Sequence, residues 1–337
     1  MRKQLVVVGG TAAGLSAASK AKRMQPGLEV NVFERSGFIS YGACGLPYYI
    51  GGLVQTETEL VDFTPEELYE KRGILAHTHH KVINISPANK TIDVLNLKNN
   101  ETLVVPYDYL VIATGASPVI PDIPGIHTKG VFSLRTVEDG MKIKKAVQEA
   151  RNRKAVVAGG GFIGLEVAEQ LTFAGIDVTV VEAMPRLLPF LDEEYSNTVR
   201  KTLEEHDVNL FTNTIVSEII SSDGEVSGVK TSDGMAIEAD FVIISVGVKP
   251  NSGLAKNAGL KIGFKNAIFV DAYMKTTDDS IWACGDCVQT YNFITKREAY
   301  VPLGTLANRQ GRIAGENIAG HKKHFQGNSC FSNNENF

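Results

Sequence analysis

The chain opens with a short continuous apolar run, Leu5 to Val8, in which three of the four residues are valine. A run of this kind predicts a strand that is buried on both faces of a parallel sheet. Residues 9–14 then form a glycine-rich turn, and the small residues after them predict a helix. A second apolar segment ends at Glu34. The pattern therefore predicts a strand, a tight turn, a helix and a second strand.

The same pattern returns in the middle of the chain. The segment KAVVAGGGFIGLEVAEQL predicts a strand, a turn with Gly159, Gly161 and Gly164, and a helix. The segment DVTVVE then predicts a strand that ends at Glu182. A glycine-rich turn at a helix N-terminus with an acid about 20 residues further on is the fingerprint of dinucleotide binding. The helix N-terminus binds the pyrophosphate, and the acid binds the ribose hydroxyls.

The two copies differ in quality. The second copy has all three glycines of the G-x-G-x-x-G pattern, whereas Thr11 replaces the middle glycine of the first copy. Either copy alone is also compatible with an ordinary strand–turn–helix unit. Two copies in one chain are more specific, because few architectures bind two adenine dinucleotides.

Three further segments combine acidic residues, a strand and a glycine: YDYLVIATGASP, ADFVIISVGVKPN and TTDDSIWACGDCVQ. With the two turns, they make the sequence similar to the pyridine nucleotide–disulfide oxidoreductase family over residues 1–325. The resemblance implies an α/β fold with two Rossmann-like dinucleotide-binding domains. Residues 1–118 and 250–320 would form a discontinuous FAD-binding domain, and residues 119–249 an inserted NAD(P)-binding domain.

The resemblance also implies which residues contact the cofactors, FAD and NADH or NADPH. In the discontinuous domain these are Gly9, Gly10, Ala12, Ala13, Gly14, Glu34, Arg35, Ser40, Thr114, Gly115, Gly285 and Asp286. In the inserted domain they are Gly159, Gly161, Phe162, Ile163, Gly164, Glu166, Glu182 and Gly247. Glu182 would repel a 2′-phosphate and favours NADH, while the nearby Arg186 leaves NADPH open. Phe162 is assigned to the nicotinamide site, with core packing as the alternative.

Cys44 stands without a second cysteine before Cys284, so the sequence resembles the single-cysteine branch of the family. That branch contains coenzyme A-disulfide reductases, NADH oxidases and NADH peroxidases. We predict that Cys44 lies at a helix N-terminus, where exposed amides favour thiolate; the alternative is a buried, inert cysteine. A lone thiol forms a mixed disulfide with an outside thiol or a sulfenic acid. Ala12 occupies the position where the peroxidases and water-forming oxidases carry a histidine, which favours the disulfide chemistry.

Coenzyme A would need cations for its phosphates. Lys20, Lys22 and Arg23 resemble basic residues that relatives use for this purpose, although a solvated helix face explains them equally well. Lys71 and Arg72 are alternatives.

Composition adds limits to this picture. The 337 residues carry a formal net charge of -4, which argues against a nucleic-acid or anionic-membrane partner. Four cysteines are too few for a disulfide scaffold, and no apolar run is long enough to span a membrane. We therefore expect a cytoplasmic protein. We also expect residues 321–337 to be an atypical polar tail, without the interface domain through which relatives form homodimers.

Two further motifs suggest a redox pair and a metal site, but we predict neither. Cys284 and Cys287 have the spacing of a redox pair but flank Asp286, so we predict no working dithiol. His77, His79 and His80 lie in HTHHKVINI, which we interpret as one alternating strand, and we predict no metal.

The predicted function is an FAD-dependent NAD(P)H oxidoreductase that reduces coenzyme A disulfide, or a related disulfide or persulfide, through Cys44. Two alternatives stay open. One is an NADH oxidase that reduces oxygen, and the other is a nucleotide-binding remnant that has lost full catalysis.

Overall fold

The computed structural model describes residues 2–329, which form two compact units. The first unit contains the described parts of Met1–Gly42, Val61–Ser117 and Lys249–Phe337. The second contains Ala43–Leu60 and Pro118–Val248.

The first unit is built on a five-stranded parallel sheet with the strand order β18-β7-β1-β2-β3. Its strands are β1 (Gln4–Val8), β2 (Glu29–Phe33), β3 (Leu75–His77), β7 (Tyr109–Ile112) and β18 (Ile281–Ala283). In β1 the apolar run Leu5–Val8 is buried throughout. Burial of such a side chain stabilises the fold by about 1.5–3 kcal/mol, which explains why the strand has no polar face.

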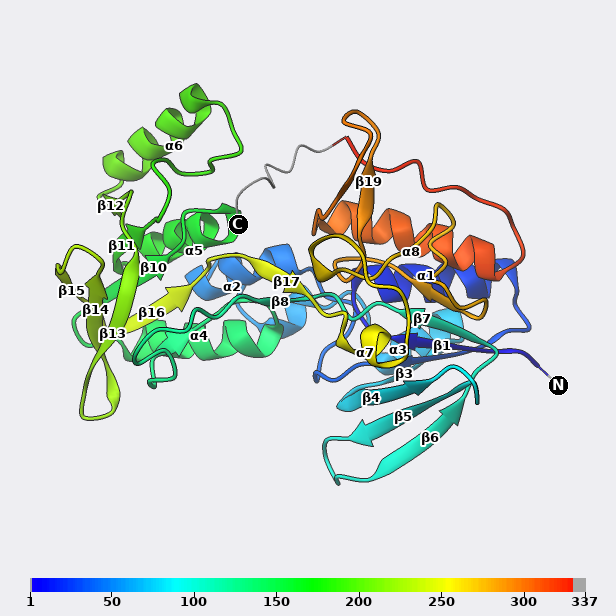
Figure 1. The fold of residues 1–337 in the computed structure, drawn as a ribbon. Coiled ribbons are helices and arrows are strands. Elements are labelled where there is room, and N and C mark those ends of the chain that lie inside the picture. The colour runs from blue at the N-terminus through cyan, green and yellow to red at the C-terminus, as the bar shows by residue number, and fades with distance from the viewer. Residues whose placement is uncertain (1, 330–337) are drawn as a thin grey trace. The chain divides into compact units, whose positions relative to one another are not determined.

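Helices cover one face of this sheet, and a small antiparallel sheet covers the other (Figure 1). The helices of the unit are α1 (Ala12–Met24), α3 (Pro65–Arg72), α7 (Gly253–Asn257) and α8 (Gly304–Ile318), with a 3₁₀ turn at Phe264–Asn266. The small sheet contains β4 (His80–Ser86), β5 (Thr91–Asn96) and β6 (Thr102–Pro106). A hairpin of β19 (Thr290–Asn292) and β20 (Arg297–Ala299) precedes α8.

Helices α1 and α8 pack directly against each other (Figure 1). A Cβ atom on Gly311 would collide with the carbonyl oxygen of Ala13, and one on Gly315 would lie 2.5 Å from the carbonyl oxygen of Ala17. Small residues on both helices therefore let the two backbones touch, which ties the C-terminal part of the unit to its first helix.

The second unit repeats the parallel design with the strand order β12-β11-β10-β16-β9. Its strands are β9 (Val131–Phe132), β10 (Lys154–Ala158), β11 (Asp177–Val181), β12 (Asn209–Phe211) and β16 (Phe241–Ile244). The antiparallel strands β13 (Val216–Ser222), β14 (Glu225–Thr231) and β15 (Ala236–Glu238) form a second sheet. The helices are α2 (Leu46–Gly51), α4 (Val137–Glu149), α5 (Phe162–Phe173) and α6 (Glu193–Glu205).

Two parallel sheets in one chain, each with the glycine-rich turn after its central strand, confirm the predicted α/β fold class. The chain passes between the units through β8 (Ala116–Pro118) and β17 (Val248–Pro250), which pair as a two-stranded ribbon. The structure groups residues 43–60 with the second unit, whereas the sequence analysis placed them in the first domain. The physical reason is that α2 packs against α4 and α5.

One local expectation was wrong in detail. The histidine segment is not one strand: β3 ends at His77, β4 begins at His80, and His79 between them has a left-handed φ of 57°. Part of the segment expected as a polar tail is packed: Phe325 is buried in the first unit's core, and the backbone N–H of Asn328 donates to the Tyr291 carbonyl at 2.9 Å. Residues 330–337 of that tail lie outside the described residues. Within residues 2–329, no helix is long and apolar enough to cross a membrane.

Candidate functional site

The turn between β1 and α1 depends on two glycines. Gly9 has a φ of 113°, and a Cβ atom there would collide with the Ala113 carbonyl oxygen. A Cβ atom on Gly14 would collide with the carbonyl oxygen of Gly9, because the first turn of α1 crosses the strand end closely. These contacts explain why both positions need glycine.

Glu34 follows β2 and holds this turn. Its Oε2 accepts the backbone N–H of Gly10 at 2.8 Å, and its Oε1 accepts that of Ser36 at 2.9 Å. The backbone N–H of Ser40 in turn donates to the Gly10 carbonyl at 2.9 Å. Glu34 and Ser40 are therefore both brought to the glycine-rich turn, while Arg35 is exposed.

The turn between β10 and α5 has the same construction. Gly159 also has a φ of 113°, and a Cβ atom on Gly164 would collide with its carbonyl oxygen. The Oε2 of Glu182 accepts the N–H of Gly160 at 2.5 Å, and its Oε1 accepts the N–H of Met184 at 2.7 Å. Glu182 is only 9% exposed, so its orientation is fixed by these bonds and by packing.

The structure explains why Thr11 replaces a glycine in the first turn. A Cβ atom at the corresponding Gly161 would meet no protein atom within 4 Å, and Thr11 and Gly161 both have extended backbones that any residue adopts. The protein itself therefore does not require glycine at this position. The remaining reason for glycine is close approach of a pyrophosphate.

Both helix N-termini fit a phosphate group. Neither Thr11 nor Gly161 caps its helix with a side-chain hydrogen bond, and the first turns of α1 and α5 contain no acidic residue. The first N–H groups of a helix have no intrahelical partner and favour anions. Ala12, Ala13 and Ile163 lie in these first turns, as the sequence analysis expected.

The end of β7 is tied by a residue that the sequence analysis did not single out. Asn251 donates from Nδ2 to the Thr114 carbonyl at 2.9 Å, while the Thr114 hydroxyl donates to the Asn251 carbonyl at 2.6 Å. The Ser117 hydroxyl donates to Asn251 Oδ1 at 2.7 Å, and the N–H of Asn251 donates to the Gly115 carbonyl at 2.9 Å. The sequence offered one signal for Asn251: it ends the Lys-Pro-Asn segment that follows strand β16 of the inserted unit.

Gly285 and Asp286 follow β18 at the same edge of the sheet as Gly9, because parallel strands end together. The N–H of Gly285, whose φ is 84°, donates to the buried Gln310 Oε1 at 2.8 Å, and the Tyr300 hydroxyl donates to the Asp286 carbonyl at 2.9 Å. These bonds fix the backbone at Asp286.

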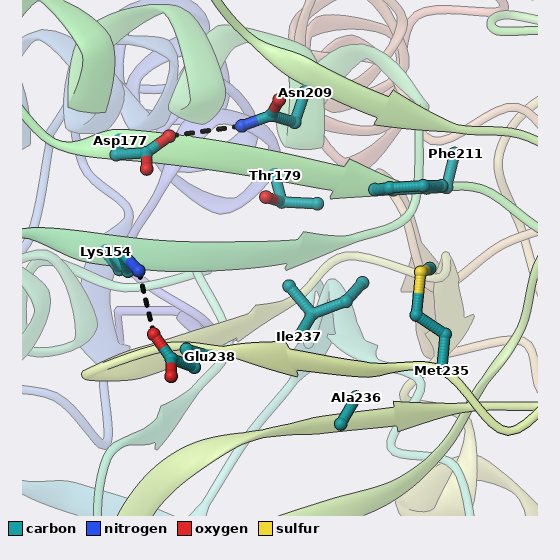
Figure 2. Close-up of a pocket in the computed structure, with 9 residues that line it drawn as sticks. All are labelled: Lys154, Asp177, Thr179, Asn209, Phe211, Met235, Ala236, Ile237 and Glu238. Carbon is teal, nitrogen blue, oxygen red and sulfur yellow. Dashed lines mark hydrogen bonds and ion pairs between the residues drawn. The ribbon is translucent and has the colours of Figure 1, made fainter.

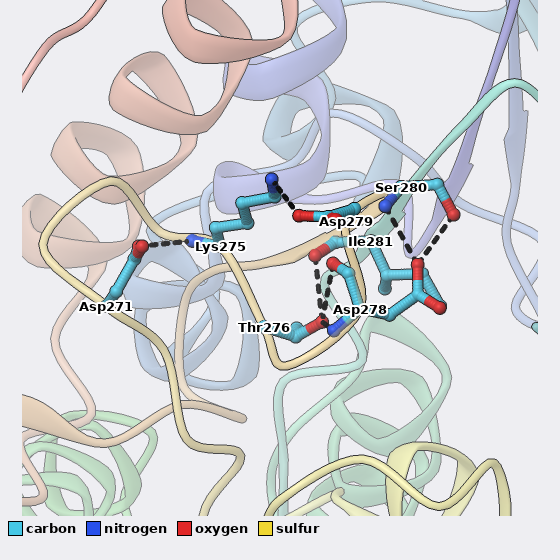
Figure 3. Close-up of polar contacts among 7 residues, drawn as sticks. All are labelled: Asp271, Lys275, Thr276, Asp278, Asp279, Ser280 and Ile281. Atoms are coloured by element: carbon cyan, nitrogen blue, oxygen red, sulfur yellow. Dashed lines mark hydrogen bonds and ion pairs between the residues drawn. The ribbon is translucent and has the colours of Figure 1, made fainter.

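The polar loop before β18 is also tightly bonded (Figure 3). Asp271 accepts the backbone N–H of Lys275 at 2.9 Å, and the Lys275 ammonium pairs with Asp279 at 2.6 Å. Asp278 accepts both the N–H and the hydroxyl of Ser280, at 2.8 and 2.7 Å. The loop thereby positions the strand that delivers Asp286.

Cys44 lies in the 3₁₀ turn Ala43–Gly45, which runs directly into α2. Its side chain is exposed. The alternative of a buried cysteine is therefore wrong for this position.

The nicotinamide candidates lie at the start of α5. Phe162 is 55% exposed and its ring lies 4.9 Å from that of Phe190, so it is not a core residue. Burial, and then the charge of Glu169, raise the pKa of Glu166.

Two further candidates of the second unit lie outside α5. Arg186 donates to the Pro189 carbonyl at 3.2 Å. Gly247, with a φ of 113°, accepts the N–H of Val119 at 2.9 Å.

The candidate coenzyme A cations on α1 differ in their partners. Lys20 pairs with Glu316 at 2.8 Å, and Lys22 donates to the Leu28 carbonyl at 2.7 Å. Arg23 is exposed. Arg72 on α3 donates to the Ser19 hydroxyl at 2.8 Å. Lys20 and Lys22 would have to exchange these partners to bind a phosphate.

Cys284 and Cys287 are fully buried. Burial raises the pKa of the Cys287 thiol to about 11 and that of the Cys284 thiol well above its ordinary value. The Cys287 thiol donates to the Cys284 carbonyl at 3.3 Å. Both groups are therefore held as neutral thiols, away from solvent.

The histidines have protein partners of their own. His77 stacks on Phe33 at 4.8 Å and contacts Asn31 Oδ1 at 3.1 Å, and burial lowers its pKa. The Nδ1 of His80 lies 2.7 Å from the Thr78 carbonyl. Within residues 2–329, no group of three or more histidine, cysteine, aspartate or glutamate residues could hold a metal ion.

A pocket of the second unit lies between strands β10, β11 and β12 of its parallel sheet and the segment that contains β15 (Figure 2). Its lining residues are Lys154, Asp177, Thr179, Asn209, Phe211, Met235, Ala236, Ile237 and Glu238. Lys154 pairs there with Glu238 at 2.8 Å. None of these residues belongs to the turn between β10 and α5, so this pocket is not the candidate nucleotide site.

Comparison with known proteins agrees with this geometry. A family model described as pyridine nucleotide-disulphide oxidoreductase matches residues 3–311, so the chain belongs to that enzyme family, whose members use FAD and NAD(P)H.

Three similar proteins illustrate the range of activities. The chain is 40% identical to an NADH oxidase of Methanocaldococcus jannaschii, with 95% of this chain and 71% of the relative covered. It is 37% identical to an NAD(P)H coenzyme A polysulfide/persulfide reductase of Pyrococcus horikoshii, with 97% and 72% covered. The solved structure of an NAD-dependent persulfide reductase from A. fulgidus matches with a TM-score of 0.92 and 43% identity, over 96% of this chain and 60% of that one. The chain thus spans less than two thirds of that solved protein.

Proposed function

We propose that the protein is an FAD-dependent NAD(P)H oxidoreductase that reduces coenzyme A disulfide, or a related disulfide or persulfide, through Cys44. The observation that carries the proposal is the exposure of Cys44, since the other two cysteines of the described chain are fully buried. The names of the P. horikoshii and A. fulgidus relatives support this class of substrate.

The residues of the first unit fit FAD, and those of the second fit NADH. In the first unit, the α1 N-terminus would hold the pyrophosphate, Glu34 the adenosine ribose and Asp286 the other end of the dinucleotide. In the second unit, the α5 N-terminus and Glu182 would hold the pyrophosphate and the ribose of NADH. The support is the matching pair of uncapped helices and bonded carboxylates.

Cys44 carries the sulfur chemistry. Its thiolate attacks one sulfur of a disulfide RSSR, a Cys44–SR mixed disulfide forms, and RS⁻ leaves. NADH then supplies two electrons that break the Cys44–SR bond. This step releases a second RS⁻ and regenerates the Cys44 thiolate, while NADH becomes NAD⁺ and one proton. FAD, when bound, supplies the two-electron exchange between the nicotinamide and the mixed disulfide.

The Cys44→Ser variant tests the proposal. We expect it to keep bound flavin and its reduction by NADH under anaerobic conditions, and to lose reduction of coenzyme A disulfide. A Cys330→Ser variant carries the same change at another cysteine and serves as the control. Mass spectrometry of the untreated protein should find a thiol adduct on Cys44. Disulfide reduction by Cys44→Ser at the wild-type rate would refute the proposed role.

NADH oxidase activity is the second candidate, and the name of the M. jannaschii relative supports it. A sulfenic acid on Cys44, together with water as the product of oxygen reduction, would favour this activity. Failure of NADH to reduce the flavin would instead indicate a nucleotide-binding remnant.

A further inference from the structure

One lysine of α4 holds the segment that carries Cys44. The Lys144 ammonium donates to the backbone carbonyls of Val54 at 3.3 Å and Gln55 at 2.8 Å. The same ammonium lies 4.0 Å from the centroid of the Tyr49 ring, which is buried. A single half-buried cation thus contacts both α2 and the turn that follows it.

These contacts lie at the C-terminal end of α2. Gly52 ends the helix with a left-handed φ of 85°, and the N–H groups of Leu53 and Val54 donate to the Tyr48 carbonyl at 2.9 and 3.2 Å. The turn is therefore bonded back onto the helix. The Lys144 ammonium therefore binds the turn that follows α2, near the negative end of the helix dipole, from a neighbouring helix.

The other contacts of α2 leave it little freedom. Leu46, the first residue of α2, is 1% exposed, and a Cβ atom on Gly140 of α4 would lie 3.2 Å from its Cδ2. A Cβ atom on Gly51 would lie 2.5 Å from Gln170 Oε1 on α5. Helix α2 is therefore packed between α4 and α5. The first turns of α5 carry the nicotinamide candidates Phe162 and Glu166.

We propose that Lys144 is a positioning residue for Cys44. Since Cys44 lies in the turn that enters α2, bonds to the turn that leaves this short helix, together with the contact on Tyr49, restrict the orientation of the entering turn as well. The ammonium of Lys144 thereby keeps the thiol in a constant place relative to the N-terminus of α5 in the same unit. This inference rests on the proposed role of Cys44 in disulfide reduction.

The test compares two lysines of one helix. Lys144→Met keeps most of the apolar stem but removes the charge and the donors. Lys145→Met is the matched control, because Lys145 is 71% exposed and pairs only loosely with Glu149, at 3.7 Å. Lys144→Arg restores a cation with several donors and should restore the wild-type behaviour.

Three measurements are made on each variant with bound flavin. Hydrogen exchange of peptides covering residues 46–55 should be roughly tenfold faster in Lys144→Met, because charge-assisted hydrogen bonds have been lost. Reduction of coenzyme A disulfide should fall roughly tenfold to a hundredfold, as expected for a misplaced reacting group. The rate of flavin reduction by NADH should stay within about twofold, because the α5 turn is unchanged.

The outcomes separate positioning from other roles. Unchanged hydrogen exchange in Lys144→Met would overturn the inference, and so would faster exchange with a wild-type rate of disulfide reduction. An equal loss of flavin reduction would also overturn it, since the defect would then not be confined to the cysteine. If the wild type reduces no disulfide, the proposed function fails. The exchange data then decide alone: faster exchange supports the role of Lys144 in holding α2 and the turn after it, and unchanged exchange refutes that role.

Discussion

Glu34 and Glu182 occupy equivalent positions in two separate units of one chain. Each accepts the backbone N–H of the second glycine in its turn, from Gly10 at 2.8 Å and from Gly160 at 2.5 Å. In each case the other carboxylate oxygen accepts the N–H of the residue two positions after the glutamate. The two carboxylates are thus oriented by the same pair of bonds at the carboxyl edge of a parallel sheet.

The first prediction concerns the nicotinamide coenzyme. The fixed, nearly buried carboxylate of Glu182 should repel a 2′-phosphate, so NADH should bind at least about tenfold more tightly than NADPH. Glu182→Gln should reduce this preference by improving the binding of NADPH. Rates of anaerobic flavin reduction with the two nucleotides measure the effect.

Glu34→Gln, the same change in the other unit, is the control and should leave the preference for NADH unaltered. Equal affinity of the wild type for both nucleotides would show that a cation such as Arg186 offsets the glutamate.

The second prediction concerns flavin occupancy. Asp286→Ala should lower the amount of FAD in the purified protein, because the aspartate lies at the end of β18, where its backbone is fixed by Tyr300. NADH binding by the second unit should persist. Asp122→Ala, at an exposed carboxylate of the second unit, is the control. Full retention of FAD, measured from its absorbance relative to protein, would remove Asp286 from the site.

The third prediction separates two glycines of one turn. Gly164→Ala should lower the free energy of unfolding by about 1–3 kcal/mol, because the new methyl group would collide with the Gly159 carbonyl oxygen. Gly161→Ala should leave stability unchanged, because its Cβ faces open space, but should weaken NADH binding. Denaturant unfolding and nucleotide titration measure the two effects. Equal stability losses would contradict the open space at Gly161, and unchanged NADH binding in Gly161→Ala would contradict its assignment to the pyrophosphate.

The fourth prediction concerns Cys284 and Cys287. Burial raises the pKa of Cys287 to about 11 and raises that of Cys284 as well, so the folded state keeps protons that the unfolded chain releases at lower pH. The stability contributed by these neutral thiols is present below their unfolded pKa, near 8.5, and should be lost as the pH rises toward about 11. Unfolding free energies between these pH values check the sign.

Alkylation gives an independent measure of the same burial. In a Cys330→Ala background at pH 8, iodoacetamide should modify Cys44 rapidly and the buried pair only after unfolding. Rapid modification of Cys287 in the folded protein would show that this thiol is reachable.

Much of the site could be predicted from the sequence because its parts are local. Gly9 and Gly14 are close in the chain, and the turn that they form depends on their own backbone angles and on the next helix. The acid that orients the turn lies one strand further on, at a spacing that a single helix and strand determine.

Other features depend on partners that are remote in the chain. The bonds of Asn251 to Thr114 and Ser117 form only once the chain has returned from the inserted unit, so the Lys-Pro-Asn segment alone did not reveal what this residue binds. The turn at His79 interrupts an apparently continuous strand pattern because the residues on its two sides pair with different sheets. His77 pairs with Phe33 of β2, and His80 begins the antiparallel sheet with β5.

The sequence by itself determined the two nucleotide-binding turns and marked Cys44 as the candidate nucleophile, because a short run of residues carries that chemistry. Only the tertiary structure decided that the Cys44 segment belongs to the second unit. That placement depends on the fit of Leu46 against Gly140, on Gly51 against Gln170 and on the reach of the Lys144 ammonium. Such fit is a property of surfaces from distant parts of the chain, which a local pattern does not contain.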